Sequence, residues 1–420
     1  MVRLLIHEGG ESVAATVGGA AAVVGAVATV GAAACLCPTV VVGSNRARAA
    51  TRKEGSVRDT LLEAHPRRRS PDGAANPGLA QQVLEALARR RSPGAILCYH
   101  GIARSAPARS IHVSPEELAA AAALLRRVAT VVPLREIVER ARAGRSTAGL
   151  VALTFDDAYV SVAVEAADFL QREAVPITLF VVTQAARDGA RFWWDRLESL
   201  AHGLDGVAWR RLLDRLAVPD RYRTESGDGA ARFARVRAWV LRHHAGREPP
   251  GLADAAAGLE AGTASAAGTG ADGIGGVGED RAMTFDELDR LVASGLVDVG
   301  VHTVTHAALP LLSDEEVREE VRACYAALRE RWPGSVPVLA APYGLVDERV
   351  VRLAREAGMA ASLTLSDNTL AVTGPGGGIP RLGMSRGDPL WKLPLRCAGV
   401  AEKVRKWRTG RVDAGPELPA

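Results

Sequence analysis

The feature that most constrains the fold is a repeated alternation of short apolar segments with helical segments. The apolar runs are typical of buried strands, and they lie at residues 94–100, 150–155, 176–182, 296–301 and 336–341, with two more in MAASLTL (359–365) and IPRLGM (379–384). Strands that alternate with helices are typical of a parallel sheet, so the sequence predicts an α/β architecture.

Three of the helical segments begin with a capping box, in which a Ser or Thr and a Glu three residues later cap the helix together. These boxes start at Ser114, Thr284 and Ser313. Residues 158–173 and 347–358 also have a helical pattern. Each of these helices follows or precedes a predicted strand, as a βαβ chain requires.

The alternation defines a domain of residues 94–400 that is interrupted by an insertion at residues 187–282. Residues 251–280, within the insertion, are a Gly- and Ala-rich low-complexity segment that we expect to be flexible. Residues 44–93 have the Arg- and Pro-rich composition of a linker, and residues 401–420 form a tail.

The leader, residues 1–43, contains an uncharged stretch at residues 12–43 that is long enough to cross a bilayer but consists mostly of Ala, Gly and Val. Three interpretations stay open. The first is a membrane anchor or uncleaved signal, which would give membrane association. The second is a disordered or mis-started leader, and the third is a segment that is lipid-modified at Cys35. The sequence does not choose between them, so it leaves the localisation open.

Charge and cysteine content exclude several other classes. The net charge is +4, and the basic runs at Arg46–Lys53, Arg67–Arg69 and Arg89–Arg91 have no aromatic residues between them, so we expect no nucleic-acid partner. The five cysteines show no CxxC spacing, which argues against a zinc ribbon or a disulfide framework.

Polar residues follow several of the predicted strands. Because functional groups of parallel α/β proteins gather at the C-terminal ends of the strands, we expect one shared site that contains His100, Asp156, Asp157, His302, His306 and Tyr343. His302 and His306 are four residues apart, a spacing that brings two imidazoles to one metal ion in a helix or tight turn. Two histidines and one carboxylate form a common open metal site, and a cation would also offset the repulsion between the adjacent acids.

The motifs TFDDA (154–158), HTVTH (302–306) and PYG (342–344), in this order, resemble the polysaccharide deacetylase family (NodB homology domain, carbohydrate esterase family 4). The resemblance covers about residues 94–390, and YHGI (99–102), FWWD (192–195) and PRLGM (380–384) are similar to one branch of the family. It implies a distorted (β/α) barrel of about seven parallel strands, with the insertion between the third strand and the strand that precedes the metal histidines.

The resemblance also implies the roles of individual residues. Asp156 would be the catalytic base, and Asp157, His302 and His306 would bind a divalent metal, usually zinc, with cobalt or nickel as alternatives. The backbone N–H of Tyr343 would stabilise the oxyanion. The implied function is metal-dependent removal of acetyl groups from N-acetylated sugars of a glycan, that is, hydrolysis of carbon–nitrogen bonds other than peptide bonds.

The sequence departs from the family pattern at two points. Many members carry an Arg where this chain has Ala340, and many carry a late histidine as general acid, whereas no histidine follows His306 here. Our hypotheses are that Arg381 reaches the site and replaces the missing Arg, and that His100, the remaining histidine at the end of a core strand, is the acid or orients the site.

Three residues are candidate contacts for the sugar: Trp193 and Trp194, whose aromatic faces suit carbohydrate rings, and Arg381. Packing of the insertion against the barrel is the alternative role of the tryptophans, and a salt bridge elsewhere is that of Arg381. Alternatives also exist for the function: a glycan-binding homologue that lost catalysis, or an O-acetyl esterase. A non-haem iron oxygenase is disfavoured because its HxD…H order is absent.

Overall fold

The computed structural model describes residues 2–8, 11–17, 92–104, 111–224, 227–257, 280–366, 368–370, 377–400 and 403. Its contacts divide the chain into two units, residues 1–78 and 79–420. In the first unit, β1 (Val2–Glu8) and β2 (Glu11–Val17) form a two-stranded antiparallel sheet. The remainder of the predicted leader, and the predicted linker up to residue 91, lie outside the described residues. Among the described helices, none is long and apolar enough to cross a membrane.

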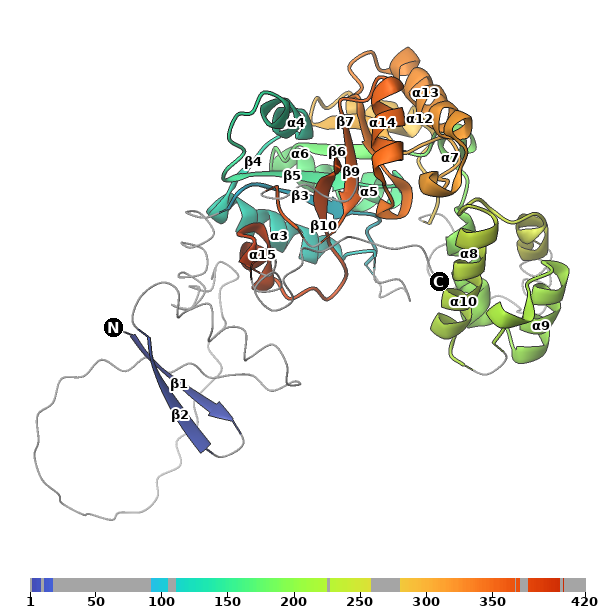
Figure 1. Cartoon of the computed structure of the whole chain (residues 1–420), viewed down its shortest axis with the longest axis horizontal. Coiled ribbons are helices and arrows are strands. Elements are labelled where there is room, and N and C mark those ends of the chain that lie inside the picture. The colour runs from blue at the N-terminus through green and yellow to red at the C-terminus, as the bar shows by residue number, and fades with distance from the viewer. Residues whose placement is uncertain are drawn as a thin grey trace, which may run out of the picture. The chain divides into compact units, whose positions relative to one another are not determined.

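The second unit is built on a closed barrel of seven parallel strands (Figure 1). Its strand order is β3-β10-β9-β8-β7-β6-β5, and pairing of β3 with β5 closes it. The strands are β3 (Ala95–Tyr99), β5 (Leu150–Phe155), β6 (Ile177–Val181), β7 (Val297–Val301), β8 (Val338–Ala340), β9 (Ala361–Leu365) and β10 (Ile379–Gly383). This confirms the predicted (β/α) barrel and each predicted strand to within a few residues. The short β4 (Thr130–Val131), which pairs with the start of β5, was not predicted.

Alternate residues of each strand belong to different cores. Ile96, Ala152 and Phe180 share one buried cluster with residues of α4, whereas Leu97 and Tyr99 join the cluster formed with the other helices. Because successive side chains of a strand point to opposite faces, the first cluster fills the barrel and the second lies between barrel and helices. The same alternation directs Cys98 and His100 toward the face that Ile96 shares.

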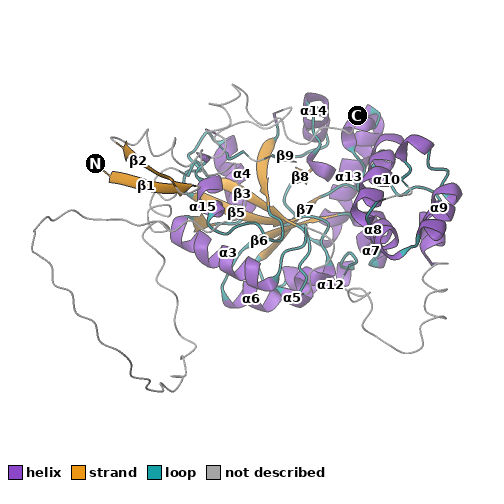
Figure 2. Cartoon of the chain, turned by 90° about the horizontal axis from the view of Figure 1, so that it is seen from below, coloured by secondary structure: helices purple, strands orange, loops and turns teal. Residues whose placement is uncertain are grey.

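Helices surround the strands (Figure 2). Outside the insertion they are α3 (Pro115–Val128), α4 (Leu134–Arg142), α5 (Val160–Glu165), α6 (Ala167–Arg172), α12 (Phe285–Val292), α13 (Asp314–Arg331), α14 (Glu348–Glu356) and α15 (Lys392–Cys397), with short 3-10 turns η3 (Leu309–Leu311) and η4 (Pro342–Gly344). All three predicted capping boxes are present. The helix predicted over residues 158–173 is instead two, because Ala166 leaves the helical backbone with φ −122°.

The insertion follows β6 and forms a lobe of helices beside the barrel (Figure 1). It contains α7 (Thr183–Asp188), α8 (Trp193–Gly203), α9 (Gly206–Arg215), η2 (Asp220–Tyr222) and α10 (Gly229–His243). These helices bury a core of their own that includes Trp193, Trp194 and Trp209. The two ends of the insertion meet, since the N–H of Ala282 donates to the carbonyl of Ala190 at 3.0 Å.

The segment predicted to be flexible, residues 251–280, differs from that prediction at its beginning. Residues 252–257 are helical, and Leu252 and Ala255 are buried in the core of the insertion. Small Ala side chains allow this turn to pack closely against its neighbours, although they gave the sequence its low-complexity appearance. Residues 258–279 lie outside the described residues, as do those of the tail apart from residue 403.

Candidate metal centre and active site

The ends of β5 and β7 bring Asp157, His302 and His306 together. Asp157 Oδ1 lies 3.4 Å from Nε2 of His302 and 3.3 Å from Nε2 of His306. The three ligand atoms lie within 4.8 Å of one another. The side chains are nearly inaccessible, with 3, 1 and 6% of their residue surface exposed. Asp157 Oδ1 is nevertheless a buried oxygen without a hydrogen bond.

The backbone turns sharply at the residues of this group. Asp157, Thr303, His306 and Tyr343 have left-handed φ values of 67°, 68°, 60° and 60°. Such a conformation is costly for residues with a side chain, and it persists where the surrounding structure enforces it. In the strand-to-loop turn after β5, it separates the directions of the Asp156 and Asp157 side chains.

Hydrogen bonding and burial prepare both imidazoles as ligands. The Nδ1 of His302 donates to the carbonyl oxygen of Ala340 at 2.8 Å, and its Nε2 faces Asp157. Burial lowers the pKa of His306 to about 3, so this ring is neutral near pH 7. For His302, the neighbouring carboxylates outweigh the effect of burial and raise the pKa, so a metal ion would have to replace the proton on Nε2. Neutral imidazole and carboxylate are the donor set that divalent zinc prefers, so the residues fit the metal that the family pattern implies.

Asp156, the neighbour of Asp157, has a protein partner instead. Arg381 of β10 donates from Nη1 to Asp156 Oδ1 at 2.6 Å and from Nη2 to Oδ2 at 2.7 Å. Both residues are buried, with Arg381 fully inaccessible. Burial would raise the pKa of Asp156, but the Arg381 guanidinium outweighs it and lowers that pKa well below the usual range. Asp156 is therefore an ionised carboxylate held in one orientation.

Cys98 of β3 and His100, which directly follows β3, lie beside Asp156. The Cys98 thiol lies 3.4 Å from Asp156 Oδ2, and burial raises the pKa of Cys98 well above its usual value, so it acts as a neutral donor. Ligand atoms of Cys98, His100 and Asp156 lie within 4.8 Å of one another. The sequence predicted His100 at this place but not Cys98. The two-residue strand period, which puts Cys98 on the same face as His100, was the available signal.

Tyr343, in the turn after β8 of the barrel, also contacts the insertion. Its hydroxyl donates to the carbonyl of Gly246 at 2.8 Å, and Trp193 Nε1 donates to the same carbonyl at 2.8 Å. A Cβ on Gly246 would lie 2.5 Å from the Tyr343 ring, so only glycine allows this approach. In the same turn, a Cβ on Gly344 would lie 2.4 Å from Cβ of Leu365, which explains the glycine of PYG.

Trp193 and Trp194, the predicted sugar contacts, are buried, with 4 and 8% of their surface exposed. The Trp194 ring packs 4.4 Å from the His306 ring, and its Nε1 donates to the hydroxyl of Tyr159 at 2.8 Å. Trp194 thus packs against His306, one of the candidate metal ligands.

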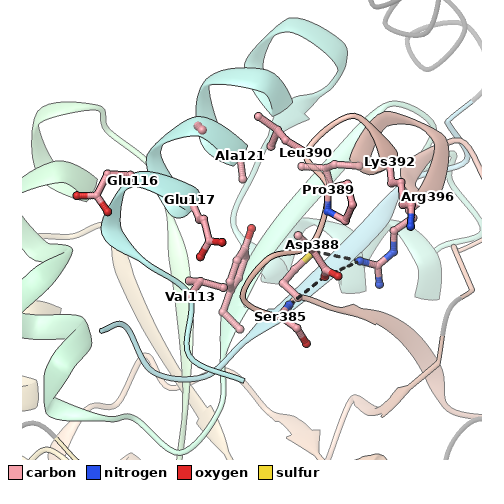
Figure 3. Close-up of a pocket in the computed structure, with 14 residues that line it drawn as sticks. Val113, Glu116, Glu117, Ala121, Ser385, Asp388, Pro389, Leu390, Lys392 and Arg396 are labelled. Carbon is pink, nitrogen blue, oxygen red and sulfur yellow. Dashed lines mark hydrogen bonds and ion pairs between the residues drawn. The ribbon is translucent and has the colours of Figure 1, made fainter. Parts of the chain in front are cut away.

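A cavity of about 320 Å³ lies elsewhere, between the start of α3 and the segment around α15 (Figure 3). Val113, Glu117, Asp388 and Leu390 are among its lining residues. None of the candidate site residues lines it. This cavity is therefore separate from the Asp157–His302–His306 group.

The fold and the site together define an α/β-barrel protein with a buried Asp-His-His group beside an Arg-held carboxylate. The chain contains a polysaccharide deacetylase domain, because residues 143–210 and 274–362 match the model of that family. Asp156, Asp157, His302, His306 and Tyr343 all lie in the matched residues. The unmatched residues between the two parts fall inside the insertion, and the match does not extend to His100 or Arg381.

Solved structures of deacetylases are similar to the chain. The deacetylase PplD of Streptococcus pyogenes, solved with acetate, shares 14% identity over 70% of this chain and 92% of its own, with a TM-score of 0.42. IcaB of Ammonifex degensii shares 19% identity over 74% of this chain and 97% of its own, with a TM-score of 0.45. The polysaccharide deacetylase BC0361 of Bacillus cereus shares 14% identity over 72% of this chain and 68% of its own, at 0.43. No curated protein matches the chain.

Proposed function

We propose that this protein is a metal-dependent hydrolase that removes acetyl groups from the N-acetylated sugars of a glycan. The observation that carries the proposal is the convergence of Asp157, His302 and His306 on one point, with Asp157 Oδ1 within 3.4 Å of both Nε2 atoms. Next to them, Asp156 is an ionised carboxylate whose two oxygens are held by Arg381. The polysaccharide deacetylase domain supports the same substrate class.

A divalent ion held by Asp157, His302 and His306, most simply zinc, would polarise the acetyl carbonyl and lower the pKa of a water molecule. Asp156 is the general base that accepts a proton from the attacking water. Arg381 fixes the orientation of the carboxylate and keeps it ionised. The backbone N–H of Tyr343, in the turn η4 that follows β8, donates to the oxyanion.

The leaving amine needs a proton, and His100 is the residue that we assign to this step. Its ring lies within 4.8 Å of the Asp156 carboxylate, and its Nδ1 is buried without a hydrogen bond. We assign Arg381 to Asp156 rather than to the sugar, because both of its terminal nitrogens are bound by that carboxylate and the residue is fully buried.

The test is acetate release by the purified chain, stripped of metal by a chelator and reloaded with zinc, cobalt or nickel. Substrates are N-acetylglucosamine oligomers, peptidoglycan fragments and O-acetylated xylan. We expect metal-dependent release from an N-acetylated glycan and none from the stripped chain.

Two outcomes would contradict the proposal. Release from O-acetylated xylan alone would identify an O-acetyl esterase. Glycan binding without release, with any of the three metals present, would identify a binding protein that has lost catalysis.

A further inference from the structure

The loop of residues 303–306 follows His302 and ends at His306. Hydrogen bonds within this loop are not enough to fix its backbone. Thr303 and His306 both have left-handed φ values, 68° and 60°, and neither is glycine. Within the loop, the His306 N–H donates to Thr303 Oγ1 at 2.9 Å. That single bond leaves the amides of the two residues between them to be bound from outside the loop.

Those two amides are bound by a buried carboxylate of α13. Glu320 Oε2 accepts from the N–H of Val304 and from that of Thr305, both at 2.9 Å. Glu320 Oε1 accepts from the hydroxyl of Thr305 at 2.5 Å. Only 5% of Glu320 is exposed, so these bonds form in surroundings of low dielectric, where charge-assisted bonds are strong.

The counter-charge of this carboxylate comes from the insertion. Arg247, just after α10, donates from Nη2 to Glu320 Oε1 at 3.1 Å and from Nε to Thr305 Oγ1 at 3.2 Å. Its neighbours are fixed as well, since the carbonyl of Ala245 accepts from the N–H of Ala308 at 2.7 Å. Arg247 of the insertion and Glu320 of α13 therefore both bind the loop of residues 303–306.

We propose that Glu320, held by Arg247 of the insertion, is a positioning residue that fixes the His306 loop and thereby sets the affinity for the metal. The proposal rests on the metal-binding part of the proposed function. It gives the insertion a role in the metal centre itself, beyond any contact with the glycan. Supporting groups behind metal ligands typically change metal affinity by about 10- to 100-fold when they are removed.

The experiment measures zinc affinity of the full chain by competition with a chromophoric chelator, without reference to activity. For Glu320→Ala we expect affinity to fall by about 10- to 100-fold. Glu320→Gln keeps one acceptor oxygen and should fall less, and Arg247→Gln should weaken zinc binding by about threefold to tenfold. The matched controls are Glu319→Gln on the exposed side of α13 and Arg211→Gln on α9, both of which should bind zinc as the wild type does.

A second readout distinguishes positioning from general destabilisation. Cobalt-loaded Glu320→Gln should show an altered visible absorption spectrum, because His306 approaches the ion differently, whereas the controls should not. If Glu320→Ala fails to fold by circular dichroism, Glu320→Gln and Arg247→Gln carry the test. Wild-type zinc affinity and cobalt spectra in both of these folded variants would overturn the inference. A wild-type chain that binds no divalent metal would instead overturn the proposed function.

Discussion

The two sides of the site satisfy their charges in different ways. On the barrel side, Asp156 is bound by Arg381 and the Cys98 thiol, so the protein supplies its counter-charge. On the loop side, next to the segment His302–His306, Asp157 faces two histidines. The His302 ring is held by the carbonyl of Ala340 and the His306 ring packs against Trp194, but Asp157 Oδ1 has no hydrogen bond. The difference supports the proposal that Asp157 binds a cation and that Asp156, whose charge is already balanced, serves as the base.

Substitution of Arg381 tests the barrel side, because it removes the counter-charge of Asp156. In Arg381→Met the burial of Asp156 persists without a counter-charge, so the pKa of Asp156 should rise and the acidic limb of kcat/KM should move up by about one pH unit or more. Breaking a buried pair from one side also costs about 3–5 kcal/mol of stability. The pH–rate profile of acetate release and thermal unfolding measure both effects.

The sign of the pH dependence follows from the lowered pKa of Asp156 in the wild type. The pair stabilises the fold fully above the ordinary pKa of an Asp, about 3.9, and this contribution disappears as pH falls toward the lowered value. Arg381→Lys keeps a charge but loses the two-point contact, so its shift should be smaller. An unchanged acidic limb in folded Arg381→Met would argue against Asp156 as the base.

His100 is the next test of the barrel side. His100→Gln should lower kcat for an N-acetylated glycan by about 100-fold, because the amine leaves only with a proton. An aryl acetate, whose leaving group needs no proton, should be hydrolysed by the variant at close to the wild-type rate. His202→Gln, exposed on α8, is the control. Equal losses on both substrates would show that His100 orients the site instead.

The loop side predicts a smaller effect at Trp194. Trp194→Phe removes the hydrogen bond to Tyr159 but keeps an aromatic ring against His306, so we expect a loss of about 1 kcal/mol of stability and little change in kcat/KM. Thermal unfolding and acetate-release kinetics are the measurements. A large loss in kcat/KM at unchanged stability would restore Trp194 as a sugar contact.

The sequence predicted the local features of the molecule well. Strand runs such as residues 150–155 are continuous apolar segments, and the three capping boxes are complete within four residues, so each could be recognised without knowing its neighbours. The order of the strands is not local. The hypothesis that Arg381 reaches Asp156 needed the order β5-β3-β10, which no periodicity contains.

Glu320 shows the other limit. It belongs to the acidic run DEEVREEV, and its composition is that of a solvated helix face. Its position in the helical repeat, however, indicated burial, because Glu320 lies on the same face of α13 as the buried Val317, Val321 and Cys324. A carboxylate on such a stripe must find partners inside the protein, and those partners, the amides of the histidine loop, are visible only in the folded chain.

The central claim is that the adjacent acids of TFDDA have separate duties, and metal analysis of two matched variants tests it most directly. Asp156→Asn and Asp157→Asn remove one charge each from neighbouring positions. By elemental analysis after zinc loading and gel filtration, Asp156→Asn should retain one zinc per chain and release no acetate, whereas Asp157→Asn should lose the metal as well. Loss of zinc from Asp156→Asn, or its retention at wild-type affinity in Asp157→Asn, would contradict the account.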